Sequence, residues 1–405
     1  MRMMRIANSI KYLPPAEWPV VLRARALAGV DAPDLDACLQ AFSNHNDFYA
    51  KRLAGVSNWQ DITPLSKSEL AALPVVSEEP IHDVRTSGTS GFQVTVRNTV
   101  SERRFRQALA YRPFLFYPLA TSSGNEMRQV IFVDGLEVDA ADKQQWPFEF
   151  GEHKWLTWRA GIAAPAEKIV ALLTSIRPQI IRGLSSGIVR FVEQANTPLD
   201  RLGVQVISTS GEHLTPAWRA SMGSAFGAPV LDRYGSMETS SIAWQCPYCD
   251  DYHANSDEII LETNSAGLLA TPLFIESQPL LRYQLGDRVE LHRQEHDCRI
   301  RLPKLTVLEA RRDDWIFDGN GQKVSPLSFQ LEQVAGLTAW RIHQLKSGVL
   351  RLYFDADERA ATDIRKQLTD HIQRIVPGRD CELVTGIWKL ERVGKFKRVV
   401  SDFNK

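Results

Sequence analysis

The sequence predicts an α/β fold: a large N-terminal domain of layered α/β sheets with a small β-rich subdomain, then a small α+β C-terminal domain. Three observations lead to this prediction. Strand patterns alternate with amphipathic helical patterns between residues 94 and 226, short strands and turns fill residues 259–308, and a mixed pattern of strands and helices follows residue 315. A chain of 405 residues, 44% hydrophobic and 24% charged, has the size and composition of two globular domains.

Apolar residues recur at helical spacing in several segments of the first half, and β-branched residues gather in short runs between them. Expected helices cover residues 16–53 (broken near Pro33), 62–73, 101–112, 167–175, 183–194 and 215–226. Expected strands cover residues 80–84, 94–96, 129–134, 179–182 and 204–208. Residues 136–150 are charged and irregular and predict no element. Alternation of strands with helices favours a mainly parallel sheet.

The second half of the sequence has a different pattern of expected elements. Expected strands at residues 259–262, 268–273, 280–284, 288–292 and 299–301 indicate a small antiparallel subdomain at about 259–308. The charged run 311–314 predicts a linker, so the chain divides into a core at 1–310 and a C-terminal domain at 315–405. That domain is expected to contain helices near 326–335 and 358–375 and strands at 339–345, 349–355 and 381–384.

Composition excludes several functional classes. The formal net charge is +0, so nothing indicates the basic surface of a nucleic-acid-binding protein. No apolar run reaches the length of a transmembrane helix, and the first 14 residues lack the apolar stretch of a signal peptide. Five cysteines in a chain of this length do not predict a disulfide framework. We therefore expect a cytoplasmic protein that binds neither nucleic acid nor membrane.

A loop made only of Gly, Ser and Thr lies between two expected strands. Its residues are Thr86, Ser87, Gly88, Thr89, Ser90 and Gly91. Such a loop exposes backbone N–H groups and hydroxyls that can bind phosphate oxygens, and its glycines allow the backbone to approach them closely. A flexible hairpin turn is the alternative interpretation.

Three further segments carry groups that suit a nucleotide and its metal ion. Tyr234 precedes Gly235 at a strand end and can stack on a flat ring, and Glu238 can bind a hard cation such as Mg²⁺. Asp287 can accept hydrogen bonds from a ribose diol, or can stabilise its own turn. Lys395 can neutralise a phosphate or an oxyanion, or can belong to a basic surface tail. Glu238 can equally be a solvated residue at a helix start.

The sequence also predicts a metal site. Cys246, Cys249 and His253 have the spacing C-x2-C-x3-H, which places three zinc-ligating groups in one tight turn. A closed tetrahedral site needs a fourth ligand, for which Cys298 is the first choice and His296 the alternative. With four protein ligands, such a zinc ion would be structural. Two free thiols and a surface histidine are the alternative interpretation.

Taken in order, these segments resemble the adenylate-forming (ANL) superfamily, and within it the phenylacetate–CoA ligase-like branch. The resemblance covers roughly residues 86–399. Matching motifs are the phosphate loop at 86–91 with Ser90 for Thr, Tyr-Gly-x-x-Glu at 234–238, Arg-Tyr-x-x-Gly-Asp at 282–287, the hinge at 310–314 with Ala310 for Gly, and Gly-Lys-x-x-Arg at 394–398. Gln93 and Val94 stand where the family loop often continues with Pro and Lys or Thr. Some members of the branch carry a structural zinc at a similar Cys-Cys-His segment.

The resemblance implies an AMP-forming acid–CoA ligase. ATP and a carboxylic acid, expected to be aromatic or heteroaromatic, would form an acyl-adenylate, and the thiol of coenzyme A would then take the acyl group. Transfer to an amine or to a carrier-protein thiol is the alternative within the family, and a non-catalytic nucleotide-binding homologue is the alternative outside enzymes. A homodimer is compatible with the resemblance.

The family also implies roles for individual residues. Lys395 would reach the carboxylate and the α-phosphate, and Glu238 would bind Mg²⁺. Tyr234 would stack on adenine, Asp287 would hold the ribose, and Asp313 would be the hinge between the core and a mobile C-terminal lid. The implied nucleotide-binding residues are Thr86, Ser87, Gly88, Thr89, Ser90, Gly91, Ser210, Gly211, Glu212, Asp232, Tyr234, Gly235, Ser236, Asp287 and Arg311.

Overall fold

The computed structural model describes residues 9–85, 94–121, 124–133, 148–309, 315–329, 331, 334–356, 361–387 and 397–403. The chain forms two compact units. The first comprises residues 1–129, 142–158 and 231–309, and the second comprises residues 130–141, 159–230 and 310–405. The predicted linker at 311–314 lies outside the described residues, so the predicted domain boundaries stay a prediction.

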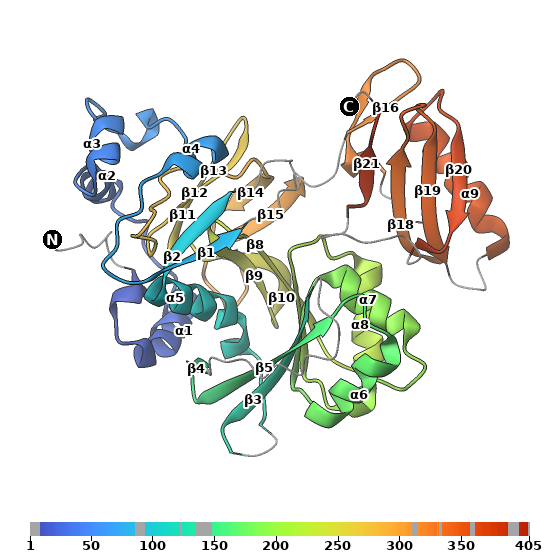
Figure 1. Cartoon of the computed structure of the whole chain (residues 1–405), viewed down its shortest axis with the longest axis horizontal. Coiled ribbons are helices and arrows are strands. Elements are labelled where there is room, and N and C mark those ends of the chain that lie inside the picture. Colours follow the sequence, from blue (N-terminus) through green and yellow to red (C-terminus); the bar gives the residue numbers. More distant parts are fainter. Residues whose placement is uncertain are drawn as a thin grey trace. The chain divides into compact units, whose positions relative to one another are not determined.

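The first unit begins with short helices (Figure 1). They are η1 (Ile10–Tyr12), η2 (Pro15–Glu17), α1 (Trp18–Ala28), α2 (Leu35–Ser43), α3 (Asp47–Arg52), η3 (Trp59–Asp61) and α4 (Lys67–Ala72). The predicted helical segment at 16–53 is therefore divided among several helices. Gly29 ends α1 with a φ of 80°, and Asp34 caps α2 by accepting from the backbone N of Ala37. Ser66 and Glu69 form a capping box on α4, which is shorter than predicted.

A hairpin and a helix follow. Strand β1 (Ile81–Arg85) pairs antiparallel with β2 (Thr95–Thr99), and the ladder ends where Arg85 faces Thr95. Residues 86–94 therefore join the two strands at one end of the ladder. Helix α5 (Val100–Tyr111) starts directly after β2, with Thr99 and Glu102 as its capping box, and continues into η4 (Arg112–Phe116).

Two antiparallel sheet regions make up most of the first unit. In one, neighbouring strands follow the order β14 (Arg288–His292), β15 (Lys304–Glu309), β10 (Cys249–Ala254), β9 (Ser240–Cys246) and β8 (Val230–Ser236). The other contains β11 (Ile259–Asn264), β12 (Gly267–Pro272) and β13 (Tyr283–Gln284). Strands β9 and β10 were not predicted. The strand predicted at 299–301 is wrong, because this segment runs as irregular chain into β15.

The second unit contains the α/β layers. Its strands are β7 (Val206–Ser210) and β6 (Ile180–Gly183), and the order continues with β3 (Glu126–Val133) and β5 (His153–Gly161), which the division into units cuts after residues 129 and 158. Strand β4 (Phe148–Phe150), which pairs antiparallel with β5, belongs to the first unit. The helices are α6 (Ala166–Ile176), α7 (Ser185–Gln194), η5 (Asp200–Leu202) and α8 (Pro216–Phe226), with α7 packed on α8 (Figure 1). Strands β6 and β7 are parallel, as predicted, because α7 connects them. Strands β8, β9, β10, β15 and β14 are antiparallel instead.

The C-terminal residues form a small α+β structure. Its elements are β16 (Ile316–Phe317), β17 (Lys323–Val324), η6 (Pro326–Ser328), β18 (Leu337–Gln344), β19 (Leu350–Ala356), α9 (Ala361–Ile375), β20 (Cys381–Thr385) and β21 (Val399–Ser401). The four-stranded sheet has the order β20-β19-β18-β21, and β21 pairs parallel with β18. Ile342, Leu352 and Leu368 are fully buried between the sheet and α9. Strands β18, β19 and β20 and helix α9 were predicted, but β16, β17 and β21 were not. The helix predicted near 326–335 is represented among the described residues by the short η6.

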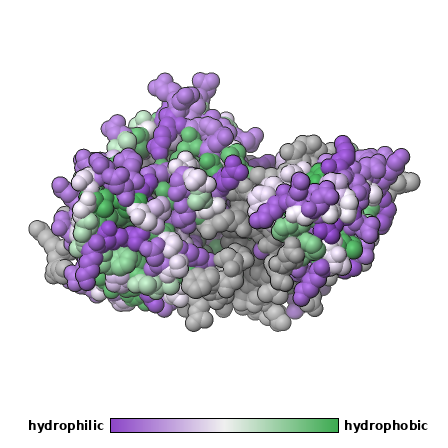
Figure 2. All heavy atoms as spheres, turned by 90° about the horizontal axis from the view of Figure 1, so that it is seen from above, coloured by the Kyte–Doolittle hydropathy of each residue, from purple (hydrophilic) through white to green (hydrophobic). Residues whose placement is uncertain are grey.

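The apolar side chains lie mainly inside the two units. The face in Figure 2 is covered mostly by hydrophilic residues, with smaller hydrophobic areas between them. Among the residues that the structure describes, no helix has the length and apolar character needed to span a bilayer.

Candidate active site and metal centre

Several predicted site residues lie outside the described residues. They are the loop Thr86, Ser87, Gly88, Thr89, Ser90 and Gly91, together with Arg311, Asp313 and Lys395. Only the ends of the loop segment can be placed. Arg85 and Thr95 face each other in the antiparallel ladder, so β1 and β2 fix where the segment leaves and rejoins the first unit.

Tyr234 and Asp287 meet in the structure. The Tyr234 hydroxyl donates to Asp287 Oδ2 at 2.6 Å, although the two residues lie 53 positions apart. Asp287 follows Gly286, whose φ of 78° makes the turn, and its carbonyl accepts from the backbone N of Leu268 at 2.8 Å. The residues predicted to contact adenine and ribose are therefore neighbours, each held by a strand or turn of the first unit.

Glu238 lies in a tight turn between β8 and β9. A Cβ on Gly235 would lie 2.2 Å from the Ser240 carbonyl oxygen, so the turn requires glycine there. The Ser236 hydroxyl accepts from the backbone N of Thr239 at 3.0 Å. Glu238 itself is only 9% exposed. The alternative of a solvated residue at a helix start is therefore wrong.

The Glu238 carboxylate contacts a second motif residue. The Tyr283 hydroxyl donates to Glu238 Oε1 at 3.3 Å. Tyr283 follows Arg282, whose guanidinium binds the carbonyls of residues 59, 60 and 62. Arg282 thus holds the chain around η3, and Tyr283 contacts Glu238. The sequence pattern contained both residues but did not predict these roles.

Asp232 has a different environment from the one predicted. Its carboxylate accepts from the Tyr252 hydroxyl at 2.5 Å, and its backbone N donates to Gln245 Oε1 at 2.8 Å. The side chain is buried. Asp232 therefore connects β8 to β10, and its predicted nucleotide contact stays a prediction.

In the second unit, Glu212 binds the start of a helix. Its Oε2 accepts from the backbone N of Ser186 at 3.0 Å, from the Ser186 hydroxyl at 2.6 Å and from the Ser185 hydroxyl at 3.3 Å. Helix α7 has no capping side chain of its own at Leu184, so Glu212 satisfies donors of its first turn. Ser210 ends β7, and Gly211 has a φ of 86° that turns the chain toward Glu212. This capping role was not predicted.

Four potential metal ligands converge in the first unit. Cys246, Cys249, His253 and Cys298 have ligand atoms within 4.8 Å of one another. Cys246 Sγ lies 3.7 Å from Cys249 Sγ and 3.6 Å from Cys298 Sγ, and His253 Nε2 lies 3.4, 3.2 and 3.5 Å from the sulfurs of Cys246, Cys249 and Cys298. A tetrahedral zinc with Zn–S of about 2.3 Å and Zn–N of about 2.0–2.1 Å requires S–S edges of about 3.8 Å and S–N edges of about 3.6 Å. The cluster has this size.

The surroundings of the cluster suit a closed metal site. His253 Nδ1 faces the Leu302 carbonyl oxygen at 3.4 Å, which leaves Nε2 directed at the sulfurs. Burial lowers the pKa of His253 to about 4, so the ring is in the neutral form that binds metals. Cys298, not His296, joins the other three, since His296 Nε2 lies 3.1 Å from the Leu302 carbonyl oxygen. Cys246 and Cys298 belong to a buried apolar cluster.

The fold of the chain is similar to that of solved acyl-CoA ligases. A solved 2-hydroxyisobutyryl-CoA ligase, in the postadenylation state with R3-HIB-AMP, is similar with a TM-score of 0.70 and 19% identity over 98% of this chain and 93% of that chain. Benzoate CoA ligase from Burkholderia xenovorans LB400 is similar with a TM-score of 0.53 and 13% identity, covering 80% of this chain and 68% of that one. The predicted resemblance to adenylate-forming enzymes is confirmed at the level of the fold.

The sequence itself is similar to one curated protein. Indoleacetate–lysine synthetase of Pseudomonas savastanoi is 27% identical over 156 residues, which is 38% of this chain and 38% of the synthetase. No protein-family model matches the chain. The sequence relation to this synthetase therefore concerns a little over a third of each protein.

Proposed function

We propose that this protein is an AMP-forming acid–CoA ligase. In the first step a carboxylate oxygen attacks the α-phosphorus of ATP, the bond from that phosphorus to the β-phosphate oxygen breaks, and pyrophosphate leaves. In the second step the thiol of coenzyme A loses its proton and attacks the acyl carbonyl carbon, and AMP leaves. Neither step needs a covalent bond to the protein, so positioning and charge neutralisation provide the catalysis.

The observation that carries this proposal is the pairing of Tyr234 with Asp287. The Tyr234 hydroxyl donates to the Asp287 carboxylate at 2.6 Å, and the Tyr234 side chain is half-buried, so part of it is accessible to solvent. A ring for adenine and a carboxylate for the ribose diol thus lie next to each other. Glu238 lies four residues beyond Tyr234, in the turn that follows β8, and its carboxylate would bind the metal ion of the triphosphate.

Other residues would neutralise the negative charge of the ATP phosphates. Glu238 would hold Mg²⁺. When bound, the ion would neutralise part of the negative charge of the triphosphate. The loop at 86–91 would contact the β and γ phosphates, Arg311 would lie near the ribose, and Lys395 would reach the α-phosphate. The Ser210–Glu212 segment would line the adenine pocket through Ser210 and its backbone, because the Glu212 carboxylate caps α7.

One observation favours a second kind of acceptor for the acyl group, an amine. The match to indoleacetate–lysine synthetase makes transfer of the acyl group to an amine the alternative to thioester formation. The same match, together with the benzoate CoA ligase neighbour, supports an aromatic or heteroaromatic acid. We place the enzyme in the cytoplasm, where ATP, coenzyme A and reduced cysteines coexist.

We also propose a structural zinc ion on Cys246, Cys249, His253 and Cys298. Four protein ligands leave no open coordination position for a substrate. The ion would join the β9–β10 hairpin to the segment that enters β15. Since β9 begins two residues after Glu238, the metal would stabilise the strand behind the proposed Mg²⁺ ligand.

The test is acid-dependent release of pyrophosphate from ATP, measured over aryl, arylacetic and short aliphatic acids. Each acid is assayed alone, with coenzyme A, and with lysine. Release that requires one class of acid and is accelerated by coenzyme A supports the ligase. Acceleration by lysine instead supports the amine acceptor. Absence of release with every acid, from folded and zinc-replete protein, contradicts the proposal and favours a non-catalytic nucleotide-binding protein.

A further inference from the structure

Helix α5 carries two opposite charges on one face. Glu102 and Arg106 are four residues apart, so they lie one above the other along the helix. This helix follows β2, the strand into which the predicted phosphate loop leads. The two side chains therefore lie on the helix that directly follows the loop segment and strand β2 in the chain.

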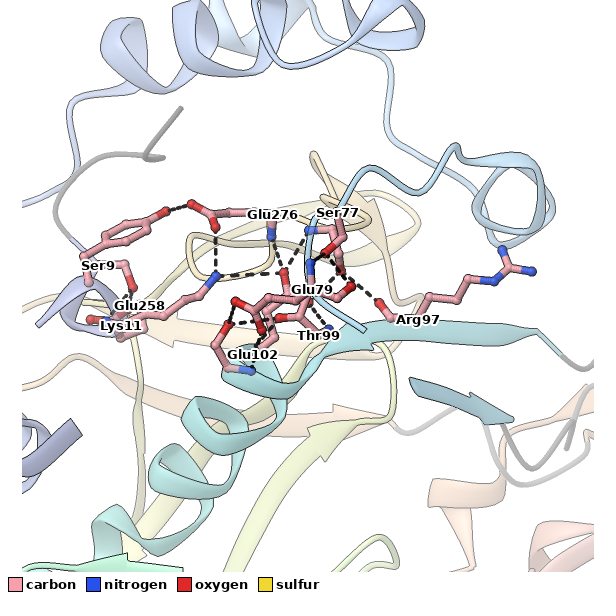
Figure 3. A network of polar contacts seen from close by, with 12 residues as sticks. Ser9, Lys11, Ser77, Glu79, Arg97, Thr99, Glu102, Glu258 and Glu276 are labelled. Carbon is pink, nitrogen blue, oxygen red and sulfur yellow. Dashed lines mark hydrogen bonds and ion pairs between the residues drawn. The ribbon is translucent and has the colours of Figure 1, made fainter. Parts of the chain in front are cut away.

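Glu102 fixes the start of α5. It is fully buried, and its Oε1 accepts from the backbone N of Glu276 at 2.7 Å and of Ser277 at 2.8 Å. Its Oε2 accepts from the Ser277 hydroxyl at 2.6 Å and from the backbone N of Thr99 at 2.8 Å. Lys11 Nζ lies 3.9 Å from Glu102 and 2.9 Å from Glu276 (Figure 3). With this many donors, the first turn of α5 has one defined position.

Arg106, one turn later, reaches the turn that presents Glu238. Its guanidinium donates to the Glu238 carbonyl oxygen at 3.1 Å and also to the Met237 carbonyl oxygen. The Ser240 hydroxyl donates back to the Arg106 carbonyl at 3.4 Å, and Ser240 has a φ of 73°, which is rare for a residue with a Cβ. Desolvation lowers the pKa of Arg106 to about 10, partly offset by Glu102, so the group stays cationic at neutral pH.

We propose that Arg106 is a positioning residue for the Mg²⁺ of bound MgATP. It holds the backbone of the turn at Met237 and Glu238, and so limits the positions that the Glu238 carboxylate can take. This inference rests on the proposed function. The planar guanidinium presents its two terminal nitrogens in a fixed fork to two successive carbonyls, whereas a lysine ammonium is a point charge on a flexible stem. Mg²⁺ tolerates little departure from octahedral geometry, so a small shift of Glu238 would weaken its binding.

The experiment is calorimetric titration of the full-length protein with ATP, with and without Mg²⁺. The variants are Arg106→Ala, Arg106→Lys and, as the matched control, Arg104→Ala, since Arg104 is an exposed arginine on the same helix. Arg106→Ala is expected to reduce the gain in ATP affinity due to Mg²⁺ about ten-fold, the effect of losing a charge-assisted hydrogen bond. Arg106→Lys should retain part of the gain. Arg104→Ala should match the wild type, and ATP affinity without Mg²⁺ should be the same in all.

A double-mutant cycle separates positioning from general stability. If Arg106 acts through Glu238, then Arg106→Ala should have no further effect in a Glu238→Gln background. Additive effects, an equal loss of ATP affinity without Mg²⁺, or a wild-type Mg²⁺ response in Arg106→Ala would each overturn the inference. No Mg²⁺-dependent ATP binding by the wild type would instead refute the proposed function, and the inference with it.

Discussion

The proposed zinc centre provides the sharpest test of the chemistry, through the substitution Cys298→Ser. Cys298 is the ligand farthest along the chain, and its sulfur lies 3.6 Å from that of Cys246 and 3.5 Å from His253 Nε2. A serine hydroxyl has nearly the same shape but does not ionise at neutral pH, so one of four metal–ligand bonds is lost. The surrounding apolar cluster keeps its volume, which confines the effect to the metal.

The expected magnitude follows from the ligand count. A structural zinc contributes about 10–16 kcal/mol to folding, so one ligand in four corresponds to roughly 3 kcal/mol. At about 2–4 °C for each kcal/mol in a domain of this size, we expect the Tm to fall by roughly 6–12 °C. The zinc content should fall from about one ion per chain to well below one, because loss of a single ligand weakens the site.

The assay is elemental analysis of protein purified without chelator, combined with thermal unfolding with and without added chelator. Cys381→Ser is the matched control, since Cys381 is a half-buried cysteine on β20, outside the cluster. It should retain zinc and the wild-type Tm. Wild-type protein that contains no zinc and whose Tm is unchanged by chelator would refute the reasoning. A replacement of zinc by cobalt that gives the visible absorption of a tetrahedral thiolate site would support it.

Two other predictions concern single carboxylates. Tyr234→Phe retains the ring but removes the donor to Asp287, so we expect the KM for ATP to rise about ten-fold with little change in kcat; an unchanged KM would contradict the proposed nucleotide site. Burial, assisted by neighbouring Asp257, raises the pKa of Glu258 from 4.5 to about 8. Because the folded pKa lies above the unfolded one, the contribution of Glu258 to the free energy of unfolding is fully present below about pH 4.5 and is lost as the pH rises from there through about 8. Urea unfolding across this range should show a shallower decline for Glu258→Gln, and identical slopes would contradict the assignment.

Local signals predicted many elements correctly. Thr99 and Glu102 form the capping box at the start of α5, and Thr215 caps α8 just before Pro216. Helical periodicity and capping residues act within a few positions, so they can be read without knowing the rest of the fold. Strands β9 and β10 were missed because their turn contains the Cys-x2-Cys segment, which reads as a metal loop. The segment predicted as a strand at 299–301 is irregular chain, in which Ile300 is buried beside the cysteines.

The sequence by itself determined which candidate groups are present: a Gly/Ser/Thr loop predicted to bind phosphates, Tyr234, Glu238 and Asp287 predicted to bind a nucleotide and its metal ion, and a Cys-Cys-His segment predicted to bind a metal. Only the tertiary structure decided which groups meet. It placed Asp287 against Tyr234, selected Cys298 over His296, and assigned the Glu212 carboxylate to α7. Those contacts join residues 26 to 53 positions apart. They depend on strand register and on the crossing of distant segments, which local sequence patterns do not specify.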